Sequence, residues 1–223
     1  MRSTNRSVQV GGTWFAIASF LMILVLVLHG PLAPDLGEQM TKVSEGATRW
    51  TVAHWIAAAS LSLFPLAGLV VLTSQSRLTE GWWTMTAWAV IPIAALWTLT
   101  TAVAEATVVT NAARSGNREV FEAWWAFAEG KATGFSFVAL AVALIAGNDA
   151  RDTARATPAW SAWTAMVAGV LSFAGWALGR WFGINSGNLL WIVSTILMSV
   201  WGVWFGVALA RSPAGALATG EEH

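Results

Sequence analysis

The sequence predicts an all-α, polytopic membrane protein with six transmembrane helices in an up-and-down bundle. Of its 223 residues, 56% are hydrophobic and 11% are charged, whereas a soluble domain carries about 25% charged residues. The apolar residues gather in six stretches. All but the first exceed the roughly 20 residues that cross the hydrocarbon core of a bilayer. Most connections are short, which favours antiparallel neighbours.

Three spans are predicted in the N-terminal half of the chain, at residues 13–29, 50–73 and 82–109. Residues 1–12 form a short polar leader. The first span is expected to be retained, because no small-residue cleavage site follows it. Pro65 should bend the second span. The third span ends with a carboxylate, Glu105.

Three further spans are predicted in the C-terminal half, at residues 120–146, 159–179 and 187–210. The fourth is unusual because its first half carries Glu122, Glu129 and Lys131. Charges are costly in hydrocarbon and mark an interior face, a water-filled cavity or a functional site. The tail, residues 211–223, is small and polar, and we expect it to be disordered.

Six spans place both chain termini on the same side of the membrane. Six Lys and Arg residues flank the spans on the terminal side and five on the other side. This excess favours cytoplasmic termini in an inner (plasma) membrane. The sixteen tryptophans lie mostly near predicted span ends, which is typical of an aromatic belt at the lipid headgroups.

The ionisable residues inside the spans gather toward the non-terminal face. They are His29, His54, Glu105, Glu129 and Arg180. At about 100° per residue, Thr101 shares a helix face with Glu105, and Thr133 shares one with Glu129. We therefore expect His54, Glu105 and Glu129 to converge in a cavity, with Arg180 above them and both threonines on the interior helix faces.

The leading hypothesis is a membrane protein that binds a small ligand or ion in this cavity, near the non-cytoplasmic face. Histidine with carboxylates suits proton coupling or cation binding. The alternative is a metal or haem protein, with His29 and His54 as axial ligands of a haem, or with His54, Glu105 and Glu129 around a first-row metal ion. Residues so close to the membrane boundary can also be mutually paired and serve folding alone.

A third hypothesis is an accessory subunit of a membrane complex, or a homo-oligomer. Gly202 and Gly206 are four residues apart in the sixth span, and such pairs let helix backbones approach closely. The chain has no cysteine and a formal net charge of zero, so nothing indicates a thiol nucleophile or a nucleic-acid partner. No nucleotide-binding glycine loop or serine elbow is present, so a non-enzymatic role is favoured. The sequence specifies no cofactor.

The opening residues carry a family resemblance. The segment from Arg6 to Ala18 (RSVQVGGTWFAIA), the apolar run after it and the Gly30-Pro31-Leu32 turn resemble a group of uncharacterised bacterial six-helix integral membrane proteins of this size. The similarity covers about the first quarter of the chain. It implies a membrane protein and carries over no activity.

Overall fold

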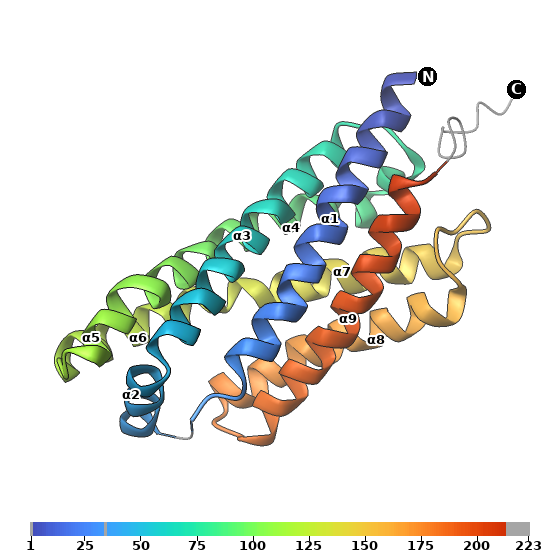
Figure 1. Ribbon diagram of the computed structural model, residues 1–223. Coiled ribbons are helices and arrows are strands. Elements are labelled where there is room, and N and C mark those ends of the chain that lie inside the picture. Colours follow the sequence, from blue (N-terminus) through green and yellow to red (C-terminus); the bar gives the residue numbers. More distant parts are fainter. Residues whose placement is uncertain (1, 34, 213–223) are drawn as a thin grey trace, which may run out of the picture.

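The computed structural model describes residues 2–33 and 35–212. Over these residues the chain is helical, without a strand, and six helical segments are long and apolar enough to cross a membrane. The predicted all-α, six-span membrane protein is confirmed (Figure 1). Of the predicted disordered tail, 211–223, all but the first two residues lie outside the described residues.

The N-terminal half contains three spans and one short connecting helix. Its elements are α1 (Arg2–His29), α2 (Leu36–Glu45), α3 (Ala47–Leu72), the 3-10 turn η1 (Arg77–Thr79), α4 (Trp82–Ala104), the π-helical η2 (Glu105–Val109) and α5 (Thr110–Arg114). The residues predicted as a polar leader continue the first helix from Arg2 onwards. Asp35 begins α2, because its carboxylate accepts a hydrogen bond from the Glu38 amide at 2.9 Å.

The C-terminal half has the remaining three spans. They are built from α6 (Arg118–Ala132) with α7 (Gly134–Arg151), α8 (Ala159–Trp176) with the π-helical η3 (Ala177–Trp181), and α9 (Ser186–Ala210). The fourth span reaches Arg151, five residues beyond its predicted end. It divides at Thr133, between α6 and α7.

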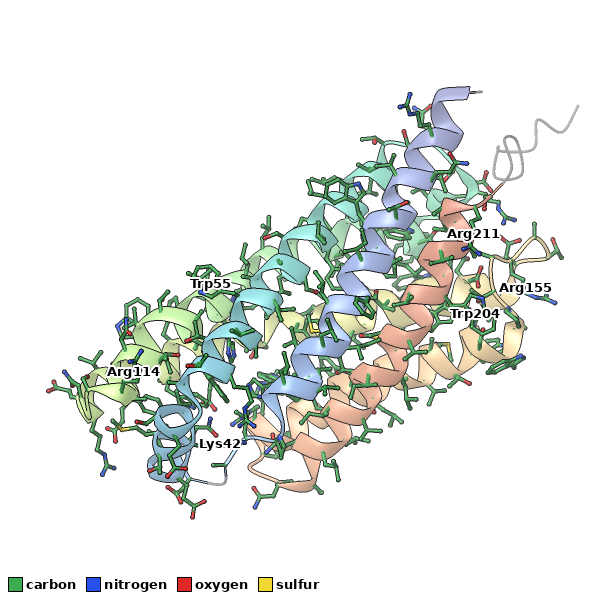
Figure 2. The ribbon with its side chains drawn as sticks, viewed as in Figure 1. Lys42, Trp55, Arg114, Arg155, Trp204 and Arg211 are labelled. Atoms are coloured by element: carbon green, nitrogen blue, oxygen red, sulfur yellow. The ribbon has the colours of Figure 1, made fainter. Side chains whose placement is uncertain are left out.

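The six spans form a closed ring. Helix α1 packs against α3 and α9, and the ring continues from α3 to α4, α7, α8 and α9. Figure 1 shows the start of α1 and the end of α9 at one end of this bundle, called the terminal end, with α2, α5 and the start of α6 at the other. Figure 2 shows Lys42 and Arg114 at that second end and Arg155 and Arg211 near the termini. The long axis of the ring therefore runs between two charged ends.

The terminal half of the ring is filled by aromatic side chains. The ring of Phe15 meets those of Phe64, Trp88 and Phe205 edge to face, with centroids 5.6 to 6.1 Å apart. All four side chains are at most 2% exposed. Only a small cavity of about 10 Å³ borders Trp88 and Phe205 in the described part of this half, so the aromatic side chains fill most of the space between the helices here.

The glycine pair proposed as a partner surface packs inside the chain. A Cβ on Gly206 would come within 2.5 Å of the Gly12 carbonyl oxygen, and one on Gly202 would meet Ser19, both on α1. The pair therefore permits the close approach of α9 to α1 that closes the ring. Helix α1 covers this face within the chain, and the expected homo-oligomer or membrane-complex partner stays a prediction.

The loops at the terminal end are fixed by buried polar contacts. Asp149 accepts hydrogen bonds from the amides of Ala156 and Thr157 and from the Thr157 hydroxyl. The indole of Trp201 donates to that same hydroxyl at 3.0 Å. Arg77 pairs with Asp152 at 3.0 Å. These contacts pair the carboxylates of Asp149 and Asp152 with groups of the same loops, as expected for a structural network.

Candidate functional site

A cavity of about 100 Å³ lies between the spans at the end opposite the termini. Such a volume holds several waters or a small ligand. Every span contributes to its wall, with Met22, His54, Thr101, Glu129, Trp176 and Trp191 as examples in span order. His29, Glu105 and Arg180 also line it. The structure thus brings the ionisable residues singled out in the sequence to one place.

Two histidines and a glutamate form a buried cluster in this cavity. His54 Nε2 lies 2.9 Å from Glu105 Oε2. One ring nitrogen of His29 joins them, and the three donor atoms all lie within 4.8 Å of one another. Each residue is at most 8% exposed. His29, from the first span, completes the cluster in the place that the sequence analysis gave to Glu129.

Backbone carbonyls fix the orientation of both imidazoles. Nδ1 of His54 lies 2.8 Å from the Trp50 carbonyl oxygen, and Nδ1 of His29 lies 2.7 Å from that of Gly30. A carbonyl oxygen only accepts hydrogen bonds, so we assign the donor proton to Nδ1 in each ring. In the neutral ring, Nε2 then carries the free lone pair, and on His54 this nitrogen is the one nearest to Glu105.

The contact between His54 and Glu105 needs a positive charge. A neutral Nε2 and a carboxylate oxygen are both acceptors, so they approach to 2.9 Å favourably only with a proton or a metal ion between them. Among the described residues, Glu105 Oε2 has no partner with hydrogen-bond geometry. The pair meets the distance of an ion pair without the alignment of a hydrogen bond, which suits two ligands of a shared ion.

Trp50 packs against both imidazoles. Its ring centroid lies 4.4 Å from that of His29 and 4.7 Å from that of His54, and the side chain is 2% exposed. The indole therefore limits the movement of both rings and excludes water from one side of the cluster. This restraint adds to the two carbonyl contacts of the histidines.

Two π-helical segments occur in the described chain, and each carries a charged residue of the site. Glu105 opens η2, and Arg180 lies in η3. The Thr110 hydroxyl donates to the Glu105 carbonyl at 2.7 Å, across the widened turn. π-Helical turns are rare and frequently occur at functional sites. In both segments the helix departs from α geometry at a charged residue that lines the cavity.

Glu129 faces Arg180 and does not join the histidines. Its Oε1 accepts from Arg180 Nη1 at 2.7 Å. The guanidinium carbon lies 5.8 Å from the ring centroid of Trp176. The pair lines both the inner cavity and an outer pocket of about 250 Å³ beside Asp35 and Gln39. The Glu129–Arg180 pair therefore forms the boundary between the inner cavity and the outer pocket.

The two predicted threonines have different positions. Thr101 lines the cavity and donates to the Ala128 carbonyl at 2.8 Å, which ties α4 to α6. Thr133 lies outside the cavity wall and accepts from the Trp176 indole at 3.3 Å. Thr133 therefore does not line the cavity itself but holds the indole of Trp176, which does.

The aromatic-belt prediction for tryptophans near span ends is wrong for three of them, Trp50, Trp125 and Trp176. All three are at most 6% exposed inside the bundle. Trp125 and Trp176 line the cavity, and Trp50 packs on the histidines. Each precedes a polar site residue by four positions: His54, Glu129 and Arg180, respectively. That one-turn spacing places tryptophan and polar residue on the same helix face and is the signal that could have found them.

Comparisons with known proteins gave no match: no family model fits the chain, and neither a curated protein nor a solved structure is similar to it. The resemblance of the opening residues to a group of bacterial membrane proteins stays an expectation. The candidate site therefore has to be argued from its own geometry.

Proposed function

We propose that this protein binds one divalent first-row transition metal ion within the membrane, through His29, His54 and Glu105. The observation that carries the proposal is the buried group of three donor atoms within 4.8 Å of one another. Imidazole and carboxylate are ligands suited to zinc, iron, manganese and cobalt. Two ligand atoms with bonds of about 2.0–2.2 Å to one ion lie at most about 4.4 Å apart, so from the 4.8 Å limit the side chains need to close by only a few tenths of an ångström.

The surroundings of the three residues support this proposal. Histidine ligands of metals usually donate their other ring N–H to a carbonyl or carboxylate, which fixes the tautomer and makes the ligand more basic. Both histidines here have that contact. A divalent ion would also neutralise the buried charge of Glu105, which is costly to keep unpaired in a low-dielectric interior.

Three protein ligands leave coordination positions on the ion free. Sites that bind or activate a ligand keep such a position, whereas structural zinc sites fill all four with protein groups. The cavity lies beside the cluster, so water or a small ligand can occupy the free position. The leading function is therefore metal-assisted binding of a small ligand.

The geometry favours a single ion over a haem. Two imidazoles on opposite sides of a haem iron have ring centres about 6 Å apart, from metal–nitrogen bonds of about 2 Å, with the porphyrin between them. The rings of His29 and His54 are 5.2 Å apart and meet edge to face, and Trp50 packs against both. A porphyrin would require these three side chains to separate.

The proposed setting is an inner (plasma) membrane, with both termini cytoplasmic and the cavity near the non-cytoplasmic face. The positive-inside rule supports this orientation, since the terminal side carries the excess of Lys and Arg flanking residues.

The test is a metal titration of the full chain, purified in mild detergent and stripped with a chelator. We expect one equivalent of Zn²⁺ or Co²⁺ to bind, with Co²⁺ absorption bands that report nitrogen and oxygen ligands. His54→Ala should weaken binding by at least about 100-fold, since a lost ligand should cost more than the about 10- to 100-fold of a lost outer contact. His223→Ala, which changes the remaining histidine, serves as the matched control.

Metal binding that is unchanged in a folded His54→Ala variant would contradict the proposal. Absence of stoichiometric metal binding in the unmodified chain would leave His54 and Glu105 as a protonated structural pair. A Soret band that disappears in His54→Ala would favour the haem alternative.

A further inference from the structure

The guanidinium of Arg180 has an unused edge. Nη1 is bound to Glu129, but Nε and Nη2 are buried and have no hydrogen-bond partner among the described residues. These two groups point from the same edge of the planar guanidinium, the edge that binds a carboxylate through two parallel hydrogen bonds. Buried donors without partners are costly, so an anionic ligand at this edge would remove a cost that the protein carries.

A second donor without a partner lines the same cavity. Trp191 Nε1 is buried and has no hydrogen-bond partner within the described part of the chain. The Trp176 ring is a neighbour of both groups: its centroid lies 5.3 Å from that of Trp191 and 5.8 Å from the Arg180 guanidinium carbon. The indole of Trp176 itself donates to Thr133. The available donors of Arg180 and Trp191 therefore both lie next to Trp176.

The remainder of the cavity wall is mainly apolar. It includes Met22, Val25, Leu26, Leu61 and Phe135. A cavity with an apolar wall and a few convergent polar groups is typical of small-molecule sites. The distribution of groups suits a ligand with a hydrocarbon part and one acidic head.

The charge balance selects a monoanion. Glu105, Glu129 and Arg180 together carry one negative charge, and a divalent ion on neutral histidines would leave the cavity with one positive charge. A single carboxylate restores neutrality, which a low-dielectric site favours. This charge balance rests on the proposed metal site. The observation that Arg180 Nε and Nη2 have no partner in the described part of the chain is independent of the metal site.

From these observations we propose that the cavity binds a small amphiphilic monocarboxylic acid, with its carboxylate on the Nε and Nη2 edge of Arg180 and its hydrocarbon part along the apolar wall. The outer pocket shares Trp125, Glu129 and Arg180 with the cavity. A ligand that enters through this pocket meets Arg180 first.

The test is equilibrium dialysis of labelled hexanoate against the full chain in lipid nanodiscs, with empty nanodiscs as baseline. 1-Hexanol and hexyl phosphate are the comparison ligands, with zinc-loaded and metal-stripped protein in parallel. We expect one hexanoate per chain, bound at least about 10-fold more tightly than 1-hexanol, as a charge-assisted bidentate pair supplies. Hexyl phosphate should bind less tightly than hexanoate because of its second charge.

Variants separate the Arg180 edge from general charge. Arg180→Lys can keep the pair with Glu129 but lacks the edge, and it should weaken hexanoate binding at least about 10-fold. Arg77→Lys is the matched control: Arg77 pairs with Asp152 at the opposite end, and hexanoate binding should change less than about 2-fold. Trp191→Phe, which keeps the ring and loses the N–H, should weaken hexanoate binding about 5-fold, and it provides a second test if Arg180→Lys does not fold.

Each outcome decides the proposal. Equal binding of hexanoate and 1-hexanol, tighter binding of hexyl phosphate, or hexanoate binding unaffected by both Arg180→Lys and Trp191→Phe would overturn it. Arg180-dependent hexanoate binding by a chain that binds no zinc would support the acid site and refute the metal site. Zinc binding without Arg180-dependent hexanoate binding would support the metal site and refute the acid site.

Discussion

His54 Nε2 and Glu105 Oε2 lie 2.9 Å apart inside the ring of spans, and each side chain is less than 10% exposed. Removing two ionisable groups from water costs free energy that their attraction repays only with good geometry, so a buried pair is weak evidence of stabilisation. Here the pair lies beside His29, next to a cavity and on a π-helical turn. That combination favours a functional role.

Replacing the carboxylate tests whether its charge holds a metal ion. Glu105→Gln keeps the size of the side chain and removes the anionic ligand, so Zn²⁺ affinity should fall at least about 100-fold. Competition with a chromophoric chelator measures the change. Glu122→Gln is the control, because Glu122 pairs with Arg118 on the exposed side of α6. An equal loss in both variants would count against a specific ligand role for Glu105.

The packing of Trp50 predicts a stability difference between two neighbouring tryptophans. Trp50→Ala would empty a buried site beside both histidines and should lower the free energy of unfolding by about 3–5 kcal/mol. Trp55→Ala changes a side chain that is 50% exposed and should cost much less. Denaturant or thermal unfolding in detergent compares the two, and similar losses would contradict the packing described.

Trp50→Phe addresses the orientation of the histidines separately from stability. Phenylalanine keeps an aromatic face against the rings but fills less space. We expect a folded variant whose Zn²⁺ affinity falls by about 10-fold, the lower range for loss of an outer contact of a metal site. The chelator competition assay measures this, and an unchanged affinity would show that Trp50 does not restrain the histidines.

The contact between α9 and α1 predicts that Gly206 does not accept a larger side chain. In Gly206→Val, Cβ would meet the Gly12 carbonyl oxygen at 2.5 Å and the Ala16 amide at 2.6 Å. Overpacking of this kind costs about 1–3 kcal/mol. Gly130→Ala is the control, because no atom outside its own helix lies within 4 Å of the added Cβ. That substitution should stabilise α6 by up to about 1 kcal/mol; a Gly206→Val variant that unfolds like the unmodified chain would exclude the tight contact.

The absence of cysteine permits a direct test of orientation. Thr153 lies in the exposed loop before α8 and Ser115 in the turn before α6, on opposite sides of the fourth span. With cytoplasmic termini, a membrane-impermeant maleimide added to intact cells should label Ser115→Cys and not Thr153→Cys. Both should react after the cells are lysed. The reverse pattern would invert the topology and place the cavity near the cytoplasmic face.

The spans could be predicted because hydropathy is a local property of the chain. Six apolar runs of sufficient length are visible in the sequence, and their lengths follow from the thickness of the hydrocarbon core. The depth of each ionisable residue could be predicted in the same way, by counting from the end of its span. Helical periodicity gave the faces on which Thr101 joins Glu105 and Thr133 joins Glu129.

The partners across helices could not be predicted, because they depend on the order and rotation of helices around the ring. Sequence depth grouped His54 and Glu105 with Glu129, whereas the fold turns Glu129 toward Arg180 and supplies His29 from α1. The π-helical turn at Glu105 also shifts the register that ordinary periodicity assumes.

Burial of the tryptophans was likewise decided by the tertiary structure. Trp50 and Trp125 lie near span ends, as belt residues do, yet they face the ring interior. Composition and periodicity thus determined the membrane-spanning helices and the end at which the polar groups lie. The closure of the ring through the Gly206 contact with α1 decided which of these groups meet, because only long-range packing fixes how each helix is rotated.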